Sequence, residues 1–313
     1  MLRDQLRTIP GMNQLPLKTR VDILSMLCEG TSMRSISRIA DVSINTVTKL
    51  LVSAGKACSA FHDANLRKVR AKRVQVDAIW SFTYAKQKNV SKAKKAPPNA
   101  GDTWTWTAVE ADTRLIISWL VGGRDGQYAA AFMRDLRSRL LNRVQLTSGG
   151  HQVYVDAIEA AFGADIDYGR LVKLLGVAPE LASGHRSPAG RMSIRKERIE
   201  GNPDPKHVST SYAERQNLTM RMHMRRFTRQ TNAFSKKLEN HSHMVALYAV
   251  WYNFVKIHSA LRMTPAMAAG ISDRLWSMED LAEIIDEALP KGGQRGASKK
   301  IQTETLLGSA WRT

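Results

Sequence analysis

The sequence is poor in cysteine and contains no long apolar run. Its 313 residues include two cysteines, Cys28 and Cys58, which form no Cys-x-x-Cys zinc pair and no disulfide framework. We expect both to be small buried residues in a reducing cytoplasm. The longest apolar stretches, such as 244–251, are far too short to span a bilayer. The first residues show no hydrophobic segment of a secretion signal, so we expect no membrane partner.

Acidic residues are scarce relative to basic ones. Lysine and arginine total 47 against 28 aspartates and glutamates, which gives a formal net charge of +19. This balance favours a polyanionic partner, and nucleic acid is the usual one. A structural RNA-binding protein has the same composition and remains an alternative on charge alone. The hydrophobic fraction of 43% can support a packed core.

Residues 16–58 show the spacing of three helices. Ser32 and Ser43 can cap the second and third of them, and Ile36 and Ile39 are expected to face inward on the second. The short break between these two helices predicts a helix-turn-helix, whose second helix lies in the major groove of DNA. A small three-helix bundle without DNA contacts is the alternative. The residues expected to face DNA are Asn45, Thr46, Thr48 and Lys49.

After a basic linker at 62–72, the hydrophobic period changes from helical to alternating. Val74, Val76 and Ala78 alternate with polar residues, which predicts a strand with one apolar face and Asp77 on the opposite face. The order of elements that follows predicts a mixed α/β sheet covered by helices on both faces. Further strands are expected near 103–110, 114–121, 143–147 and 171–175, with helices near 127–141 and 152–162.

The last part of the chain begins with a segment at 177–207 that is rich in Gly, Pro and Arg and predicts an irregular insertion. A helix carrying Glu214, an apolar helix near 239–257, a short helix near 279–288 and a basic tail at 291–300 follow. The domains are therefore expected to be 1–61 for the helix-turn-helix region, 62–72 for the linker, 73–260 for an α/β core that includes the insertion, and 261–313 for a helical and basic tail.

Glu214 stands at the head of a strongly basic stretch. From Arg215 to Arg229 there are five arginines and no acid, which is typical of a surface that follows phosphates. An acid in this place fits better as a metal ligand than as a DNA contact. Alternatively, Ser211 and Glu214 form a capping box and Glu214 only bonds backbone N–H groups. The arginines expected on the DNA backbone are Arg215, Arg221, Arg225, Arg226 and Arg229.

Four short motifs follow one another along the chain. They are Val76-Asp77-Ala78-Ile79-Trp80-Ser81-Phe82, Leu146-Thr147-Ser148-Gly149-Gly150-His151, Ser211-Tyr212-Ala213-Glu214-Arg215-Gln216-Asn217, and Trp251-Tyr252-Asn253-Phe254 with His258 and Thr264-Pro265-Ala266. In this order they resemble the motifs of bacterial insertion-sequence transposases of the DDE superfamily, which have an RNase H-like core. The similarity is closest to the group related to the first-described insertion sequence, and it runs from about residue 16 to 280.

The resemblance implies metal-dependent DNA cleavage at transposon ends, followed by attack of a 3′-hydroxyl on target DNA. Asp77 would bridge two Mg²⁺ ions about 4 Å apart, and Glu214 would hold one of them, with Mn²⁺ as a substitute. The implied partners are double-stranded DNA, as inverted repeats and as target, and at least one further copy of the chain. A transposase of this kind would work in the bacterial cytoplasm, at the nucleoid.

The sequence departs from the family pattern at the middle acid of the metal-binding triad. Gly149 stands where the family has aspartate, and Ala78 replaces the acid that commonly follows the first aspartate. A lost metal ligand lowers activity strongly, so the sequence predicts a crippled active site in this copy. The alternative function is a catalytically dead DNA-binding derivative that acts as a repressor or regulator. The possible stand-ins for the missing acid are His151, Asp156 and Asp125.

Overall fold

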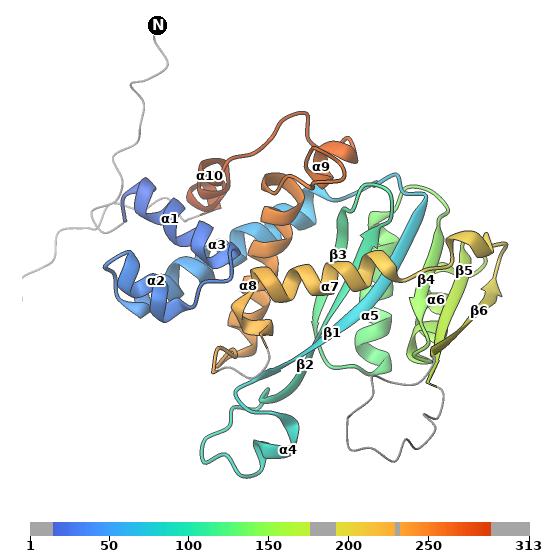
Figure 1. Ribbon diagram of the computed structural model, residues 1–313, viewed down its shortest axis with the longest axis horizontal. Coiled ribbons are helices and arrows are strands. Elements are labelled where there is room, and N and C mark those ends of the chain that lie inside the picture. Colours follow the sequence, from blue (N-terminus) through green and yellow to red (C-terminus); the bar gives the residue numbers. More distant parts are fainter. Residues whose placement is uncertain (1–14, 176–191, 229–231, 289–313) are drawn as a thin grey trace, which may run out of the picture.

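A computed structural model describes residues 15–175, 192–228 and 232–288 and is built around one six-stranded sheet (Figure 1). The strand order is β3-β2-β1-β4-β5-β6. The central strands are rich in β-branched and aromatic residues, which pack well on a pleated surface. The strands are β1 (Arg73–Thr83), β2 (Gly101–Glu110), β3 (Ile116–Gly122), β4 (Gln145–Gly149), β5 (Asp167–Leu175) and β6 (Met192–Glu200).

The pairing directions make the sheet mixed. β1, β2 and β3 form an antiparallel meander, while β4 runs parallel to β1 and β5 runs parallel to β4. β6 then returns antiparallel to β5. Three antiparallel strands followed by two parallel ones, with β1 in the centre, are an RNase H-like α/β arrangement. The predicted mixed sheet flanked by helices is therefore confirmed.

Helices cover both faces of this sheet. α5 (Gly126–Arg139) and α6 (Val153–Phe162) lie on one face, and α7 (Ser211–His223) crosses the other face over β1 (Figure 1). On the α7 side, the Gln75 side chain accepts hydrogen bonds from the first backbone N–H groups of α7. Ser81 and Thr83 are also buried. β1 therefore has one apolar face, as predicted, and its more polar face, which carries Asp77, is covered by α7.

Three helices occupy the amino-terminal region as predicted: α1 (Leu17–Cys28), α2 (Met33–Ile39) and α3 (Ile44–Asn65). Ser32 and Ser43 cap α2 and α3 through their hydroxyls. α3 continues to Asn65, so the helix extends into the segment predicted as a linker. Ile36 is buried, but Ile39 is 68% exposed, which corrects its predicted inward position. With only seven residues, α2 buries one side chain and leaves its last turn in solvent.

The carboxyl-terminal helices complete the core beside α3. The first of them, α8 (Leu238–Val250), is apolar and buried on all sides over residues 244–250, whereas its first turns carry polar residues. It ends in a π-helical turn, so its regular part is shorter than predicted. These helices are α8 (Leu238–Val250), the π-helical turn η3 (Trp251–Val255), α9 (Pro265–Ala268) and α10 (Met278–Ala288). The remaining short elements are α4 (Gln87–Val90), η1 (Pro205–His207) and η2 (Arg225–Phe227).

The segment predicted as an irregular insertion contains the edge strand β6. Both faces of this edge strand are largely exposed, including Ile194 and most of its charged neighbours. Its sequence therefore shows little alternation between apolar and polar residues. Pairing with β5 and an ion pair between Arg170 and Glu197, 2.6 Å long, hold it in place. The prediction of no regular structure is therefore wrong for β6. Residues 176–191 and the predicted basic tail lie outside the described residues. Within the described residues, no helix is both long and apolar enough to cross a bilayer.

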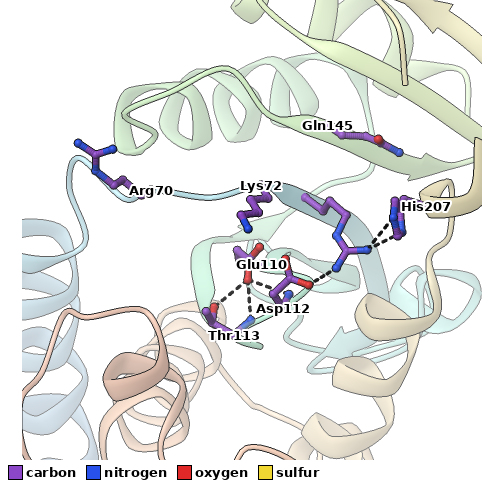
Figure 2. Close-up of a pocket in the computed structure, with 8 residues that line it drawn as sticks. Arg70, Lys72, Glu110, Asp112, Thr113, Gln145 and His207 are labelled. Carbon is purple, nitrogen blue, oxygen red and sulfur yellow. Dashed lines mark hydrogen bonds and ion pairs between the residues drawn. The ribbon is translucent and has the colours of Figure 1, made fainter. Parts of the chain in front are cut away.

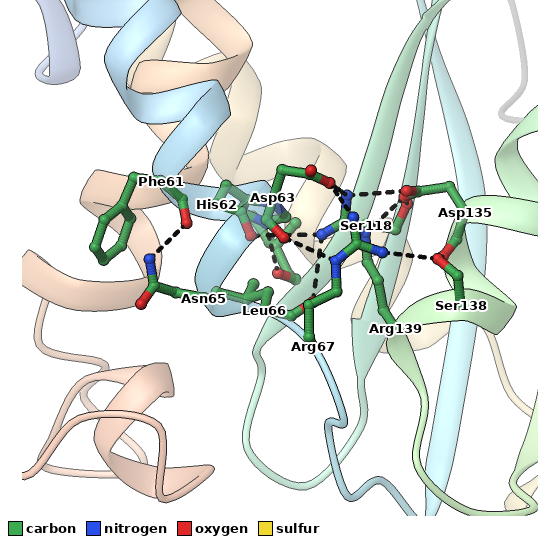
Figure 3. A network of polar contacts seen from close by, with 11 residues as sticks. Phe61, His62, Asp63, Asn65, Leu66, Arg67, Ser118, Asp135, Ser138 and Arg139 are labelled. Carbon is green, nitrogen blue, oxygen red and sulfur yellow. Dashed lines mark hydrogen bonds and ion pairs between the residues drawn. The ribbon is translucent and has the colours of Figure 1, made fainter. Parts of the chain in front are cut away.

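One buried arginine ties the amino-terminal helices to the sheet (Figure 3). Arg139, at the end of α5, is 6% exposed, and its guanidinium donates to Asp135 on its own helix and to Asp63 on α3. It also donates to the carbonyls of His62 and Leu66, which lie at the carboxyl end of α3. A single side chain therefore satisfies the end of α3 and holds it against the core.

We expect Arg139→Met to lower the free energy of unfolding by about 3 kcal/mol, because it leaves charged and helix-end acceptors without their donor. Urea unfolding followed by circular dichroism measures the change. Arg137→Met is the matched control, since Arg137 makes a more exposed ion pair with Asp165 and should contribute less than about 1 kcal/mol. Equal effects of the two variants would contradict the assigned role of Arg139.

Candidate functional site

Asp77 and Glu214 line the same pocket, although they are far apart in the sequence. The pocket has a volume of about 530 Å³ and lies where β4 ends, on the side of the sheet that α7 covers. Gly149, His151, Arg124 and Lys173 are also in its wall. β1 positions Asp77, and α7 positions Glu214 within its first turn.

The register of β1 and β4 places Asp77 beside Gly149. Val76 pairs with Ser148 in parallel, so the next residues of both strands point to the same face of the sheet. A Cβ atom at Gly149 would meet no atom within 4 Å. A side chain at position 149 would therefore extend into the pocket on the same side as Asp77. The sequence motif placed the missing acid here, and the structure leaves room for it.

Asp77 is largely buried and is held by α7. The side-chain amide of Asn217 donates to Asp77 Oδ2 over 2.7 Å. Burial raises the pKa of Asp77 above its ordinary value, and the nearby charge of Glu214 adds to the rise. The backbone N–H of Ala78 and the charges of Lys173 and Arg124 act in the opposite direction. A buried carboxylate with one amide donor needs nearby positive charge to remain ionised.

The Glu214 carboxylate has two side-chain partners, and both contact the same oxygen. Its Oε1 accepts a hydrogen bond from Thr210 Oγ1 over 2.7 Å and forms an ion pair with the Lys173 ammonium. The predicted capping box is wrong, because Thr210 is the residue before the first turn and Glu214 contacts its hydroxyl. Burial acts to raise the pKa of Glu214, but the bonds from Lys173 and Thr210 leave it below its ordinary value.

Two cations that the sequence did not single out face these two acids. Lys173 lies on β5, and Arg124 follows the end of β3, where its guanidinium stacks 4.1 Å from the centre of the Trp104 ring. Trp104 is thus a half-exposed platform for this guanidinium. Lys173 lies two residues after the buried Leu171 on β5, so both side chains point to the same face of the strand, and no local pattern in the sequence singles Lys173 out.

Of the three stand-ins for the missing acid, the structure brings only His151 into the pocket. Its Nδ1 accepts a hydrogen bond from the backbone N–H of Val153 over 3.3 Å. Burial lowers the pKa of His151, and the charge of Arg124 lowers it further, so this imidazole is neutral. Asp125 instead caps α5 through the N–H groups of its first turn. Asp156 is exposed on α6.

The donor set of the pocket does not fit two magnesium ions. It offers two carboxylates and an imidazole, which is a softer ligand than Mg²⁺ prefers. Arg124 and Lys173 cancel the formal charge of Asp77 and Glu214. Within the described part of the chain, no three histidine, cysteine or acidic side chains are grouped so that they could hold a metal. The open position at Gly149 is where the third carboxylate would have to stand.

The predicted DNA contacts are distributed over two surfaces. On α3, Asn45 and Lys49 are exposed, whereas the hydroxyl of Thr48 donates to the Ile44 carbonyl and that of Thr46 bonds to Ser43. On and after α7, the exposed arginines are Arg215 and Arg225, while Arg221 is half-buried.

Arg226 points inward. Its guanidinium donates to Ser235 Oγ over 2.7 Å and to the Met33 sulfur over 3.4 Å, and burial lowers its pKa to about 10. Because these contacts use the guanidinium to join α2 to the core, we leave Arg226 out of the proposed DNA contacts. Arg229 lies outside the described residues.

The amino-terminal helices meet the end of α7 directly. The His223 ring bonds to the carbonyl of Cys28 over 3.1 Å. Gly30, with a φ of +74°, lies so close to α7 that a Cβ there would be 2.6 Å from the carbonyl oxygen of Met222. Only glycine fits this position without displacing the backbone. The amino-terminal helices therefore pack directly on α7, and this packing fixes the exposed surfaces of α3 and α7 relative to each other.

A larger hollow of about 670 Å³ lies where β1 begins, at Arg73, and does not include Asp77 or Glu214 in its wall (Figure 2). The two acidic side chains that line it, Glu110 and Asp112, already have partners in the surrounding structure. Glu110 accepts bonds from Asp112 and Thr113 in the turn after β2, and Asp112 pairs with Arg73. Arg73 also contacts His207. Local structure accounts for these carboxylates, so we assign the functional site to the smaller pocket.

Comparisons with known proteins give little information beyond this geometry. No family model matches the chain, and a search of curated proteins finds no match. Among solved structures, a chain from "Crystal structure of a pre-cleavage Mos1 transpososome" matches with 11% identity and a TM-score of 0.18. The match covers 51% of this chain and 61% of that chain. So low a TM-score does not show a shared fold, and the RNase H-like fold is identified from the strand order.

We expect Asn217→Ala to destabilise the protein at neutral pH by about 1–3 kcal/mol, because buried Asp77 then loses its amide donor. Urea unfolding measures the difference. Thr219→Ala on the same helix is the control, since the Thr219 hydroxyl only donates to the carbonyl of Arg215. If Asn217→Ala and Thr219→Ala behave alike, the bond to Asp77 is not a significant support of the site.

Proposed function

We propose that this chain is a DNA-binding transposase of the insertion-sequence type, whose strand-cleaving centre is incomplete in this copy. One observation carries the proposal: an RNase H-like sheet brings Asp77, position 149 and Glu214 into one pocket. The four sequence motifs that resemble DDE transposases include all three positions. The net charge of +19 supports a DNA partner. Two copies of the chain would be needed to bring two transposon ends together.

The proposed DNA contacts come from α3 and from the basic region that begins in α7. Asn45 and Lys49 on α3 would read the inverted repeats in the major groove. Arg215 and Arg225, with Arg221, would hold the phosphate backbone next to the pocket. The direct packing of the amino-terminal helices on α7 supports this division, because it fixes the two surfaces relative to each other.

Gly149 favours a second candidate function that depends on the same DNA binding. A protein that occupies transposon ends without cutting them would compete with active transposase and act as a repressor. The donor set of the pocket supports this reading, since two carboxylates facing two cations form a weak site for divalent metal. A structural RNA-binding role is supported by charge alone and by no feature of the pocket.

Footprinting on the DNA that flanks this reading frame tests the DNA-binding proposal. We expect protection of matched inverted repeats. Asn45→Ala should relax sequence preference at a cost of about 1–3 kcal/mol. Lys49→Ala should weaken binding to all sequences and reduce the salt dependence. Lys56→Ala is the control on the same helix, because Lys56 is exposed but lies about two turns beyond Lys49 and about three turns beyond Asn45. Equal affinity for repeats and unrelated DNA would contradict the proposal.

Replacement of the missing acid tests the reason proposed for the loss of cleavage. We expect Gly149→Asp to nick inverted-repeat DNA in the presence of Mg²⁺ at a rate at least roughly tenfold above the unmodified chain. The open space at position 149 should let the variant fold normally. Gly150→Asp is the adjacent control, because it adds the same charge to the pocket wall one residue past the end of β4, where a Cβ meets Val172 at 3.5 Å.

Two results would contradict this account of the centre. One is full Mg²⁺-dependent nicking by the unmodified chain. The other is a Gly149→Asp variant that binds the repeats normally but nicks no faster than Gly150→Asp. Footprints measured on the same preparations separate a failure of cleavage from a failure of DNA binding.

A further inference from the structure

The pocket contains as many cations as acids. The Lys173 ammonium pairs with Glu214, and the positive charges of Lys173 and Arg124 both act on Asp77. Neither cation lies on α7, which carries Glu214: β5 carries Lys173, and the Trp104 ring supports the Arg124 guanidinium after β3. The strands of the sheet therefore bring both cations to the acids.

We propose that Lys173 and Arg124 take the place of divalent metal ions, so that the pocket is balanced by cations from the chain itself. This inference rests on the proposed function only in treating the pocket as a former metal site. Lys173 Nζ lies against Glu214 Oε1, the atom that would ligate a metal ion. A divalent ion at Glu214 must displace this ammonium or bind beside a like charge, and both cost free energy.

The same arrangement explains how a site without its third carboxylate stays charged and folded. Buried Asp77 lies near Glu214, and two carboxylates that share a site repel each other. In a metal-binding site the ions cancel that repulsion. Here the cations of the chain do so, and only part of the ligand set is left to attract a metal. Removal of Lys173 should therefore raise the affinity for divalent ions above that of the unmodified chain.

Mn²⁺ binding without DNA tests this proposal, with the full chain followed by electron paramagnetic resonance and by thermal unfolding. We expect Lys173→Met to bind Mn²⁺ roughly tenfold more tightly than the unmodified chain, because one opposing charge has been removed. Mn²⁺ should raise the Tm of Lys173→Met and leave the Tm of the unmodified chain unchanged. Lys173→Arg, which keeps the charge, should show no gain.

Lys196→Met is the matched control. Lys196 lies on the neighbouring strand β6, and its ammonium donates to the carbonyl of Pro205 and, among the residues that the structure describes, to no carboxylate. It should therefore not change Mn²⁺ binding. If Lys173→Met does not fold, Arg124→Gln removes the second cation, and we expect the same direction of change.

Three outcomes would overturn the proposal: a Tm of the unmodified chain that already rises with Mn²⁺, equal Mn²⁺ affinity in the unmodified chain and the charge-removing variants, or an equal gain in Lys173→Arg. None of these measurements involves DNA. A failed footprint with the expected Mn²⁺ result would reject the transposase proposal and leave the cation assignment intact. A normal footprint with an unexpected Mn²⁺ result would reject the cation assignment and leave the transposase proposal intact.

Discussion

The parallel pairing of β1 with β4 is the constraint on which the site depends. It fixes Asp77 next to position 149 on one face of the sheet, and the strand order then leaves that face to α7. α7 brings Glu214 to the same pocket from residues far along the chain. A shift of one residue between β1 and β4 would turn one of these positions to the opposite face. The backbone pairing thus determines which positions of the chain face the pocket.

Local patterns in the sequence predicted the elements that build this frame. Alternation identified β1, and the serine caps identified α2 and α3. The motif residues Asp77 and Glu214 were predicted to share a site, and the structure brings them together. These features follow from side chains within a few positions of one another, or from short motifs with a fixed spacing.

The features that the sequence did not reveal depend on distant contacts. β6 is a polar edge strand, so pairing with β5 defines it more than hydrophobic alternation does. The inward position of Arg226 follows from its packing against Ser235 and Met33. Lys173 looks like an ordinary surface lysine until α7 places Glu214 beside it. In each case the partner comes from another element, and no local pattern in the chain encodes it.

Asp77 and Glu214 form one electrostatic site in this structure. A double-mutant cycle with Asp77→Asn and Glu214→Gln, followed by urea unfolding at neutral pH, measures the interaction between them. We expect a coupling free energy above about 0.5 kcal/mol, because neutralising one carboxyl relieves repulsion on the other. Additive effects, as found for groups that do not interact, would show that the two carboxylates do not share a site.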